Sequence, residues 1–178
     1  MKLDMQDILS IGQKNQLIDY FSFIYENVQQ DWNVESTLKL FGIGKSNEDT
    51  EESKHIKRYY VKPADKRFNQ IYLNFDNSRN VESIVWFMDK DNSELVTLGE
   101  LVKLFGEFEI QNIIYDETTE VVFTPILNEN VQYVRTSILE WVVKRPNGSL
   151  YFKKDHSEIE VDKDYKVSSL ILKIKNSA

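Results

Sequence analysis

The run Thr97-Leu98-Gly99-Glu100-Leu101-Val102-Lys103-Leu104-Phe105-Gly106 carries the signals of one complete amphipathic helix. A threonine followed three residues later by a glutamate forms a capping box, in which each side chain accepts a backbone N–H of the first turn. The residues at helical spacing form one apolar stripe: Leu98, Leu101, Val102 and Phe105. Gly106 is the expected terminator, because glycine readily adopts the left-handed conformation that ends many helices.

A similar run occurs earlier in the chain, where Leu38-Lys39-Leu40-Phe41-Gly42 resembles residues 102–106. Three strand-like segments follow each run, and the third contains Trp86 in one case and Trp141 in the other. The glycines lie 64 residues apart and the tryptophans 55, so the first unit is longer by nine residues, which matches the polar stretch 45–53. We therefore expect two superposable helix-plus-sheet units, with both tryptophans buried at equivalent positions.

Alternating apolar residues and turn signals divide the remaining chain into elements. A helix is expected at about residues 15–29, and Asn33 is the expected cap of the helix that ends at Gly42. Strands that follow one another directly pair antiparallel. The sequence predicts an α+β protein with tandem repeats, in which N-terminal helices pack on a meander sheet. The first unit spans residues 1–89 and the second 90–178, and we expect them to form one compact body. The expected strands are 56–61, 69–75, 81–88, 110–115, 120–126, 133–144 and 150–153, with 167–175 closing the sheet.

Composition limits the classes of function. The chain has 178 residues, 41% of them hydrophobic, and no cysteine, which excludes disulfides, thiolate metal sites and a cysteine nucleophile. Residues 1–143 carry a net charge of −10 and residues 144–178 carry +3. An acidic body repels phosphate backbones and favours encounter with a basic partner, although acidity can also serve solubility alone. The N-terminus lacks the apolar run of a signal peptide, so we expect a cytoplasmic protein that binds neither nucleic acid nor membrane.

Motifs for catalysis or for metal binding are missing from the sequence. The two histidines, His55 and His156, have no metal-ligand spacing, and there is no phosphate loop, nucleophile elbow or dinucleotide fingerprint. The segment from Asp89 to Glu100 approaches a calcium-loop pattern, but Glu94 stands where the sharp turn requires glycine. We expect no metal, no cofactor and no catalytic residue. An enzyme with a carboxylate or tyrosine site remains an alternative.

Two features are candidates for binding a partner. The polar insertion ends in Glu48-Asp49-Thr50-Glu51-Glu52, whose four carboxylates form either a solvated tip or a dock for a basic surface. The second feature is a sheet face on which Glu140 corresponds to apolar residues of the first unit. That face is either covered by other elements or open to a protein. The predicted partner-binding residues are Glu48, Asp49, Glu51, Glu52, Val85, Phe87 and Glu140.

A helix ending in Leu-Phe-Gly, followed by an antiparallel meander and then repeated, resembles the beta-lactamase inhibitor protein and the small lipoprotein modules of the outer-membrane assembly machinery. The resemblance covers about residues 33–143, and this chain lacks the Gly-x-Pro that follows the helix in that group. It implies helices on one sheet face and an open face or loops that bind a protein. We expect a non-enzymatic immunity or inhibitor protein that neutralises a toxin or enzyme by direct binding. A cytosolic binding or scaffold module is the alternative.

Overall fold

The computed structural model describes residues 16–41, 51–52, 57–61, 63, 65–89, 91, 95–113, 118–125, 127–138, 149–154 and 157–175. Three helices lie within these ranges: α2 (Leu17–Asn27), α3 (Val34–Phe41) and α4 (Leu98–Phe105). The strands are β1 (Glu51–Glu52), β2 (Lys57–Val61), β3 (Phe68–Phe75), β4 (Val81–Met88), β5 (Phe108–Ile113), β6 (Thr118–Phe123), β7 (Val131–Ile138), β8 (Ser149–Lys154), β9 (Ser157–Asp162) and β10 (Ser169–Ile174).

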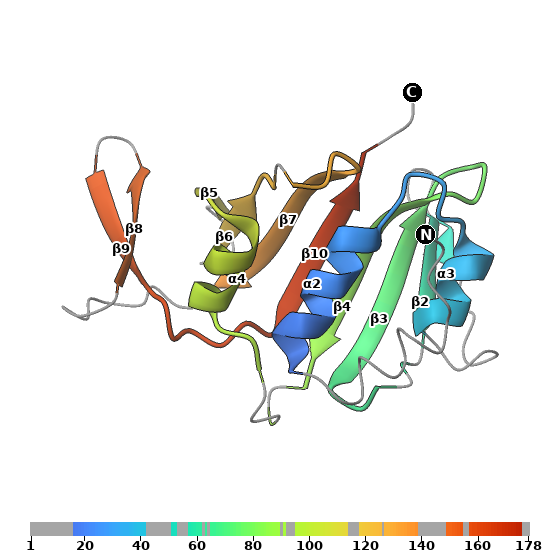
Figure 1. Cartoon of the computed structure of the whole chain (residues 1–178), viewed down its shortest axis with the longest axis horizontal. Coiled ribbons are helices and arrows are strands. Elements are labelled where there is room, and N and C mark those ends of the chain that lie inside the picture. The colour runs from blue at the N-terminus through green and yellow to red at the C-terminus, as the bar shows by residue number, and fades with distance from the viewer. Residues whose placement is uncertain are drawn as a thin grey trace.

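Eight of the described strands form one sheet in the order β1-β2-β3-β4-β10-β7-β6-β5, and every neighbouring pair is antiparallel. The strands β8 and β9 form a separate hairpin that extends beyond the β5 end of the sheet (Figure 1). The helices α2, α3 and α4 lie on one face of the eight-stranded sheet (Figure 1). The α+β class predicted from the sequence is therefore confirmed, and strands from both halves of the chain share one sheet.

The last strand occupies the middle of the sheet. The sequence predicts that residues 167–175 close the sheet, but β10 pairs with β4 on one side and with β7 on the other. Its alternate residues Leu170, Leu172 and Ile174 are buried, which suits a strand with a neighbour on each side. The C-terminal strand thus joins the two halves of the molecule.

The expectation of two superposable units is wrong for the described strands. Both halves run from an outer strand inward, from β2 to β4 and from β5 to β7, and β4 is parallel to β7 because both are antiparallel to β10. A rotation that superposes β2, β3 and β4 on β5, β6 and β7 with matching strand directions would turn the sheet over. The helices of the two halves would then lie on opposite faces. The helices of both halves nevertheless cover the same face, since Phe41 packs on Trp86 and Phe105 on Phe123. The halves share an order of elements but have opposite handedness, and Trp141 lies outside the described residues.

Trp86 is the centre of the core beneath α2 and α3. Its side chain is fully buried, and its ring centre lies 5.3 Å from that of Phe21 and 5.9 Å from that of Phe41. The indole Nε1 donates a hydrogen bond to the Tyr20 hydroxyl at 3.2 Å. Burial raises the pKa of Tyr20 well above its usual range, so this hydroxyl stays protonated. The helix expected at about residues 15–29 is present as α2, and its apolar residues at helical spacing, Leu17, Phe21 and Ile24, are buried together with Val28 just after it.

The helix α4 begins and ends as its sequence predicts. The Thr97 hydroxyl accepts the Glu100 N–H at 3.2 Å, and the Glu100 carboxylate accepts the Thr97 N–H at 3.0 Å. Gly106 has a φ of +89°, a conformation that other residues rarely adopt. Phe105 packs between Tyr25 of α2 and Phe123 of β6, at 5.1 and 5.6 Å between ring centres. These contacts hold α4 on the same sheet face as α2.

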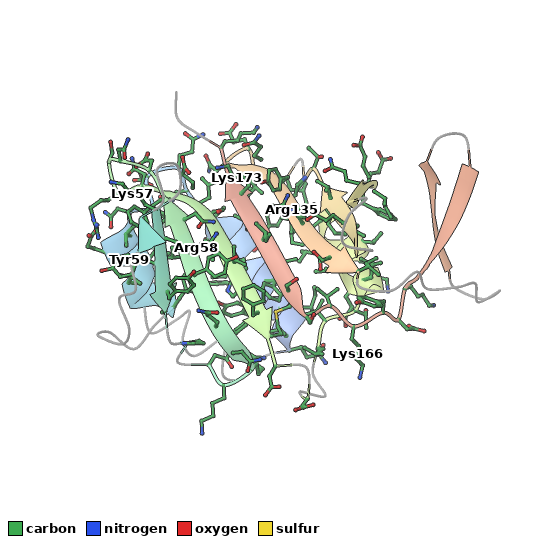
Figure 2. The ribbon with its side chains drawn as sticks, turned by 180° about the vertical axis from the view of Figure 1, so that it is seen from behind. Lys57, Arg58, Tyr59, Arg135, Lys166 and Lys173 are labelled. Atoms are coloured by element: carbon green, nitrogen blue, oxygen red, sulfur yellow. The ribbon has the colours of Figure 1, made fainter. Side chains whose placement is uncertain are left out.

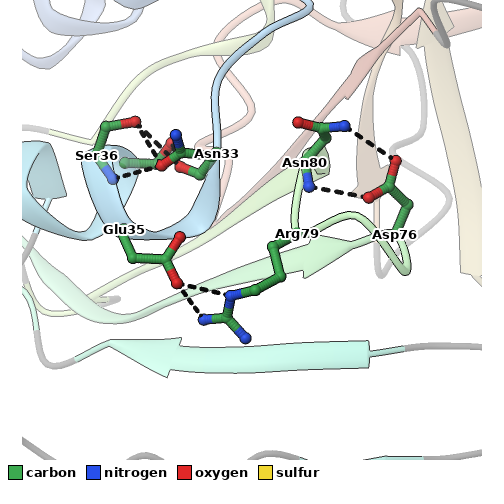
Figure 3. A network of polar contacts seen from close by, with 7 residues as sticks. Asn33, Glu35, Ser36, Asp76, Arg79 and Asn80 are labelled. Atoms are coloured by element: carbon green, nitrogen blue, oxygen red, sulfur yellow. Dashed lines mark hydrogen bonds and ion pairs between the residues drawn. The ribbon is translucent and has the colours of Figure 1, made fainter.

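A polar network fixes the start of α3 against the turn between β3 and β4 (Figure 3). Asn33 caps the helix, as predicted, by accepting the Ser36 N–H at 2.8 Å. Arg79 adopts a positive φ of 63° in the turn and donates from Nε to the Glu35 carboxylate at 2.6 Å. Asp76 closes the turn by accepting the Asn80 N–H at 2.9 Å. The network therefore links a covering helix to the strand that carries Trp86.

Candidate functional site

The described helices leave one face of the eight-stranded sheet uncovered, and we call it the open face. Figure 2 views the molecule from this side and labels Arg58, Arg135 and Lys173 upon it. Strand register places six of its residues side by side across six strands, from β6 to β2, because directly paired residues share a face. This central row consists of Val122, Arg135, Ile171, Val85, Tyr72 and Tyr60.

An aromatic strip occupies the β2, β3 and β4 side of the open face. It consists of Tyr60, Tyr72 and Phe87, with 5.6 Å between the ring centres of each successive pair. The Arg58 guanidinium lies over the Tyr72 ring, 4.3 Å from its centre. Phe87 is 37% exposed, and the other exposed large hydrophobic residue of the described chain is Leu127. Stacked tyrosine and arginine side chains of this kind supply much of the binding energy at protein interfaces.

Burial raises the pKa of Tyr72, and the positive charges of Arg58 and Arg135 oppose this shift. The hydroxyl is therefore neutral at physiological pH. The nearer of the two cations is Arg58, which lies over the Tyr72 ring. The strip thus combines apolar ring surface, a neutral hydroxyl and fixed positive charge.

A polar row lies beside the central row. The Arg58 Nε donates to the Asn74 amide oxygen at 3.0 Å, and the Asn74 amide nitrogen donates to the Ser83 hydroxyl at 2.8 Å. Register continues this row through Lys173, whose Nζ lies 4.0 Å from a Glu82 carboxylate oxygen. These contacts hold the polar side chains of the row in place on the open face.

Arg135 belongs to the central row and lies in β7, away from the aromatic strip. Ile171 and Val122 are its direct register partners, so apolar side chains flank it on both neighbouring strands. Its Nη1 lies 3.4 Å from a Glu120 carboxylate oxygen, and the guanidinium lies 5.5 Å from the centre of the Tyr133 ring. The Nε is buried and has no hydrogen-bond acceptor within the described part of the chain. About a third of the side chain, 32%, remains exposed.

Two predicted partner-binding residues lie on the open face. Val85 and Phe87 point to the same side of β4, as the alternation predicted. Phe87 offers surface, whereas Val85 is only 2% exposed and supports the Tyr72 and Ile171 side chains beside it.

The predicted acidic residues are only partly described. Glu48, Asp49 and Glu140 lie outside the described residues. Glu51 and Glu52 form β1 at the edge of the sheet, where their register partners are Arg58 and Lys57. The last two acidic residues of the predicted polar insertion therefore lie in a strand, which brings them level with two basic residues.

Sequence reasoning missed most of the open face. The sequence does not single out five of its residues: Arg58, Tyr60, Tyr72, Arg135 and Lys173. Alternation within each strand places these side chains on the face opposite to the buried apolar residues of the same strand. The missing information was the strand order, because β10 inserts between β4 and β7 and brings Arg135 into one row with Tyr72.

Within the described ranges, no three Asp, Glu or His side chains are grouped so as to hold a metal ion. The described helices are also too short or too polar to cross a membrane.

Comparison with known proteins places few constraints on function. No family model and no curated protein matches the chain. Among solved structures, a DUF4309 family protein (YjgB) from Bacillus subtilis subsp. subtilis str. 168 is similar over 96% of this chain and 99% of that chain. The TM-score is 0.42 and the sequence identity 12%.

Proposed function

We propose that the chain is a non-enzymatic protein that binds another protein through the open face. One observation carries the proposal: an aromatic strip and two arginines share a sheet face that the described helices do not cover. Large aromatic and arginine side chains anchor interfaces because they bury much surface and lose few rotamers on binding. Arg58 and Asn74, which lie beside the strip, supply directional contacts that a protein partner can match.

The most specific form of this function is an immunity or inhibitor protein that neutralises a toxin or enzyme by covering it. The small size of the chain, its net charge of −7 and the acidic segment 48–52 favour this form. Exposed acidic charge increases the rate of encounter with a basic partner without forming the centre of the contact. The acidic segment therefore steers the partner, and the open face holds it. Such a protein acts in the cytoplasm.

A scaffold or binding module unrelated to toxins is the second candidate, since the same face would serve it equally. The two functions differ in what happens to the partner. An immunity protein abolishes the partner's toxicity or activity, whereas a scaffold leaves it intact.

The test uses the purified product of the adjacent gene as the candidate partner, with binding followed by surface plasmon resonance. Phe87→Ser removes an exposed ring of the strip and is expected to weaken binding about tenfold or more. Leu127→Ser removes an equally apolar side chain that is 83% exposed in the turn before β7, and it should leave affinity unchanged. Equal binding of the partner by wild type and by Phe87→Ser would exclude the open face as the binding site. Binding without inhibition would favour the scaffold, and no binding would exclude the adjacent product as the partner of an immunity protein.

A further inference from the structure

Arg135 differs from every other arginine of the described chain. Arg58 donates to Asn74, Arg67 donates to Asp65 through both Nε and Nη2, and Arg79 donates to Glu35. Arg135 makes no hydrogen bond to any described residue, and its contact with Glu120 is an ion pair at 3.4 Å. The guanidinium has five N–H donors, so most of its hydrogen-bonding capacity is unused.

The position of Arg135 makes this lack of partners costly. Ile171 and Val122 flank it, and the Nε is shielded from water. A buried donor without an acceptor opposes folding, which is why native proteins retain few of them and why each one calls for an explanation. The ion pair with Glu120 offsets part of that cost, and the exposed part of the guanidinium keeps N–H donors that no described residue accepts.

We infer that Arg135 is the anchor for a carboxylate of the partner protein. An arginine guanidinium pairs with a carboxylate through two parallel N–H···O bonds, and a desolvated setting strengthens them. The exposed third of the Arg135 side chain gives the carboxylate access. This inference rests on the proposed function. It implies that one segment of the partner docks on the open face. That segment carries an acidic residue that contacts Arg135 and an apolar or aromatic residue that contacts the strip.

The spacing of the row sets the length of the segment. Arg135 and Tyr72 lie three strands apart in the sheet, and strands are about 4.8 Å apart, so about 14 Å separates the two positions. Ile171 and Val85 form an apolar floor between them. An extended segment rises about 3.3 Å per residue, so about five residues connect the two ends.

A single-stranded nucleic acid fits the face less well, although bases stack on aromatic strips. Glu120 and Glu82 lie beside the Arg135 and Lys173 cations and repel a phosphate backbone. The net charge of −7 repels it further.

The first test observes Arg135 directly, through the ¹⁵N–¹H signal of its Nε in the full-length protein. The signal is assigned by its loss in Arg135→Met. The probes are the blocked pentapeptide Ac-Glu-Thr-Leu-Thr-Phe-NH₂ and its counterpart with glutamine in place of glutamate, each at up to about 10 mM, since one anchor and one ring support only weak binding. The glutamate peptide should shift the Arg135 signal and the glutamine peptide should not. The Nε signal of Arg67, already bound by Asp65, is the internal control.

Equal shifts with both peptides, or none with either, would overturn the inference. So would a shift caused by an oligo(dT) strand and by neither peptide, because the anchor would then serve nucleic acid.

The second test compares Arg135→Met with Lys173→Met, which removes a neighbouring cation of the same face. Arg135→Met should weaken binding of the partner about 30-fold or more. It also leaves Glu120 without its ion-pair partner, so the melting temperature should not rise, and circular dichroism checks that the variant folds. Lys173→Met should change affinity less than about threefold, since Lys173 lies outside the central row that joins Arg135 to the strip. A lowered melting temperature with unchanged affinity would show a structural role for Arg135 and end the inference. If Arg135→Met binds normally while Phe87→Ser does not, the proposed function stands without the anchor. The reverse result leaves the anchor and removes the strip from the function.

Discussion

The two faces of the central sheet use aromatic side chains in different ways, and two neighbours in β4 illustrate the difference. Trp86 points to the face covered by helices, is fully buried, and contacts Tyr20, Phe21 and Phe41. Phe87 points to the open face, where its one described ring neighbour is Tyr72 and more than a third of its surface is exposed. One strand therefore supplies core on one side and accessible apolar surface on the other.

Polar groups show the same contrast. On the covered face, the Trp86 indole donates to Tyr20 and the buried Thr136 hydroxyl donates to the Ser169 carbonyl at 2.7 Å. On the open face, the buried Nε of Arg135 has no acceptor among the described residues. The covered face therefore satisfies these buried polar groups, whereas the open face leaves one unsatisfied beside the exposed part of the guanidinium, where the proposed anchor acts.

The largest expected effect tests the covered face. Trp86→Ala should lower the free energy of unfolding by about 3–5 kcal/mol, because it removes a fully buried ring, its contacts and the hydrogen bond to Tyr20. Urea denaturation followed by circular dichroism measures the change. A loss below about 1 kcal/mol would mean that α2 and α3 collapse onto the vacated space, and the contrast between the faces would be weaker than their burial implies.

Local chemistry in the sequence predicted part of this fold correctly. The Thr97–Glu100 capping box, the Gly106 terminator and the Asn33 cap depend on near neighbours alone, and all three are present. The alternation that places Val85 and Phe87 on one face is equally local.

Long-range pairing was not predictable in the same way. The repeat in the sequence predicted the order of elements correctly. The relative handedness of the two halves depends on the position of β10 between β4 and β7, and the residues around 169–174 do not indicate that position. The candidate site depends on the same insertion. Arg135 and Tyr72 are 63 positions apart in the chain and share a row because β4 and β10 lie between their strands. Phe87 could be predicted as a site residue, whereas Arg135 required the register.

The next effect sharpens the comparison within β4. Phe87→Ser should lower the free energy of unfolding by only about 1 kcal/mol, since its ring is partly exposed and packs against one neighbour. The same urea titration measures it beside Trp86→Ala. The two substitutions should differ at least threefold in their effect on stability, and comparable losses would show that the open face also supports the fold.

The smallest effect concerns the ion pair that holds α3 over the covered face. The hydrogen bond from Arg79 lowers the pKa of Glu35, so the folded state favours the ionised carboxylate. A group whose pKa is depressed on folding adds stability above its unfolded pKa and loses it as the pH falls through its folded pKa. Glu35→Gln should therefore lower the free energy of unfolding at pH 7, by at most about 0.5 kcal/mol because both side chains are largely exposed.

The pH dependence separates this charge effect from packing. In acid, below the folded pKa of Glu35, wild type and Glu35→Gln should have equal stability, because both then carry a neutral side chain at this position. Urea titrations of the two proteins at matched ionic strength, at pH 7 and in acid, measure the difference. A difference of the same size at both values would mean that Glu35 acts through packing or the hydrogen bond alone. In that case the start of α3 is held by Asn33 and the turn, and the charge contributes nothing to covering this face.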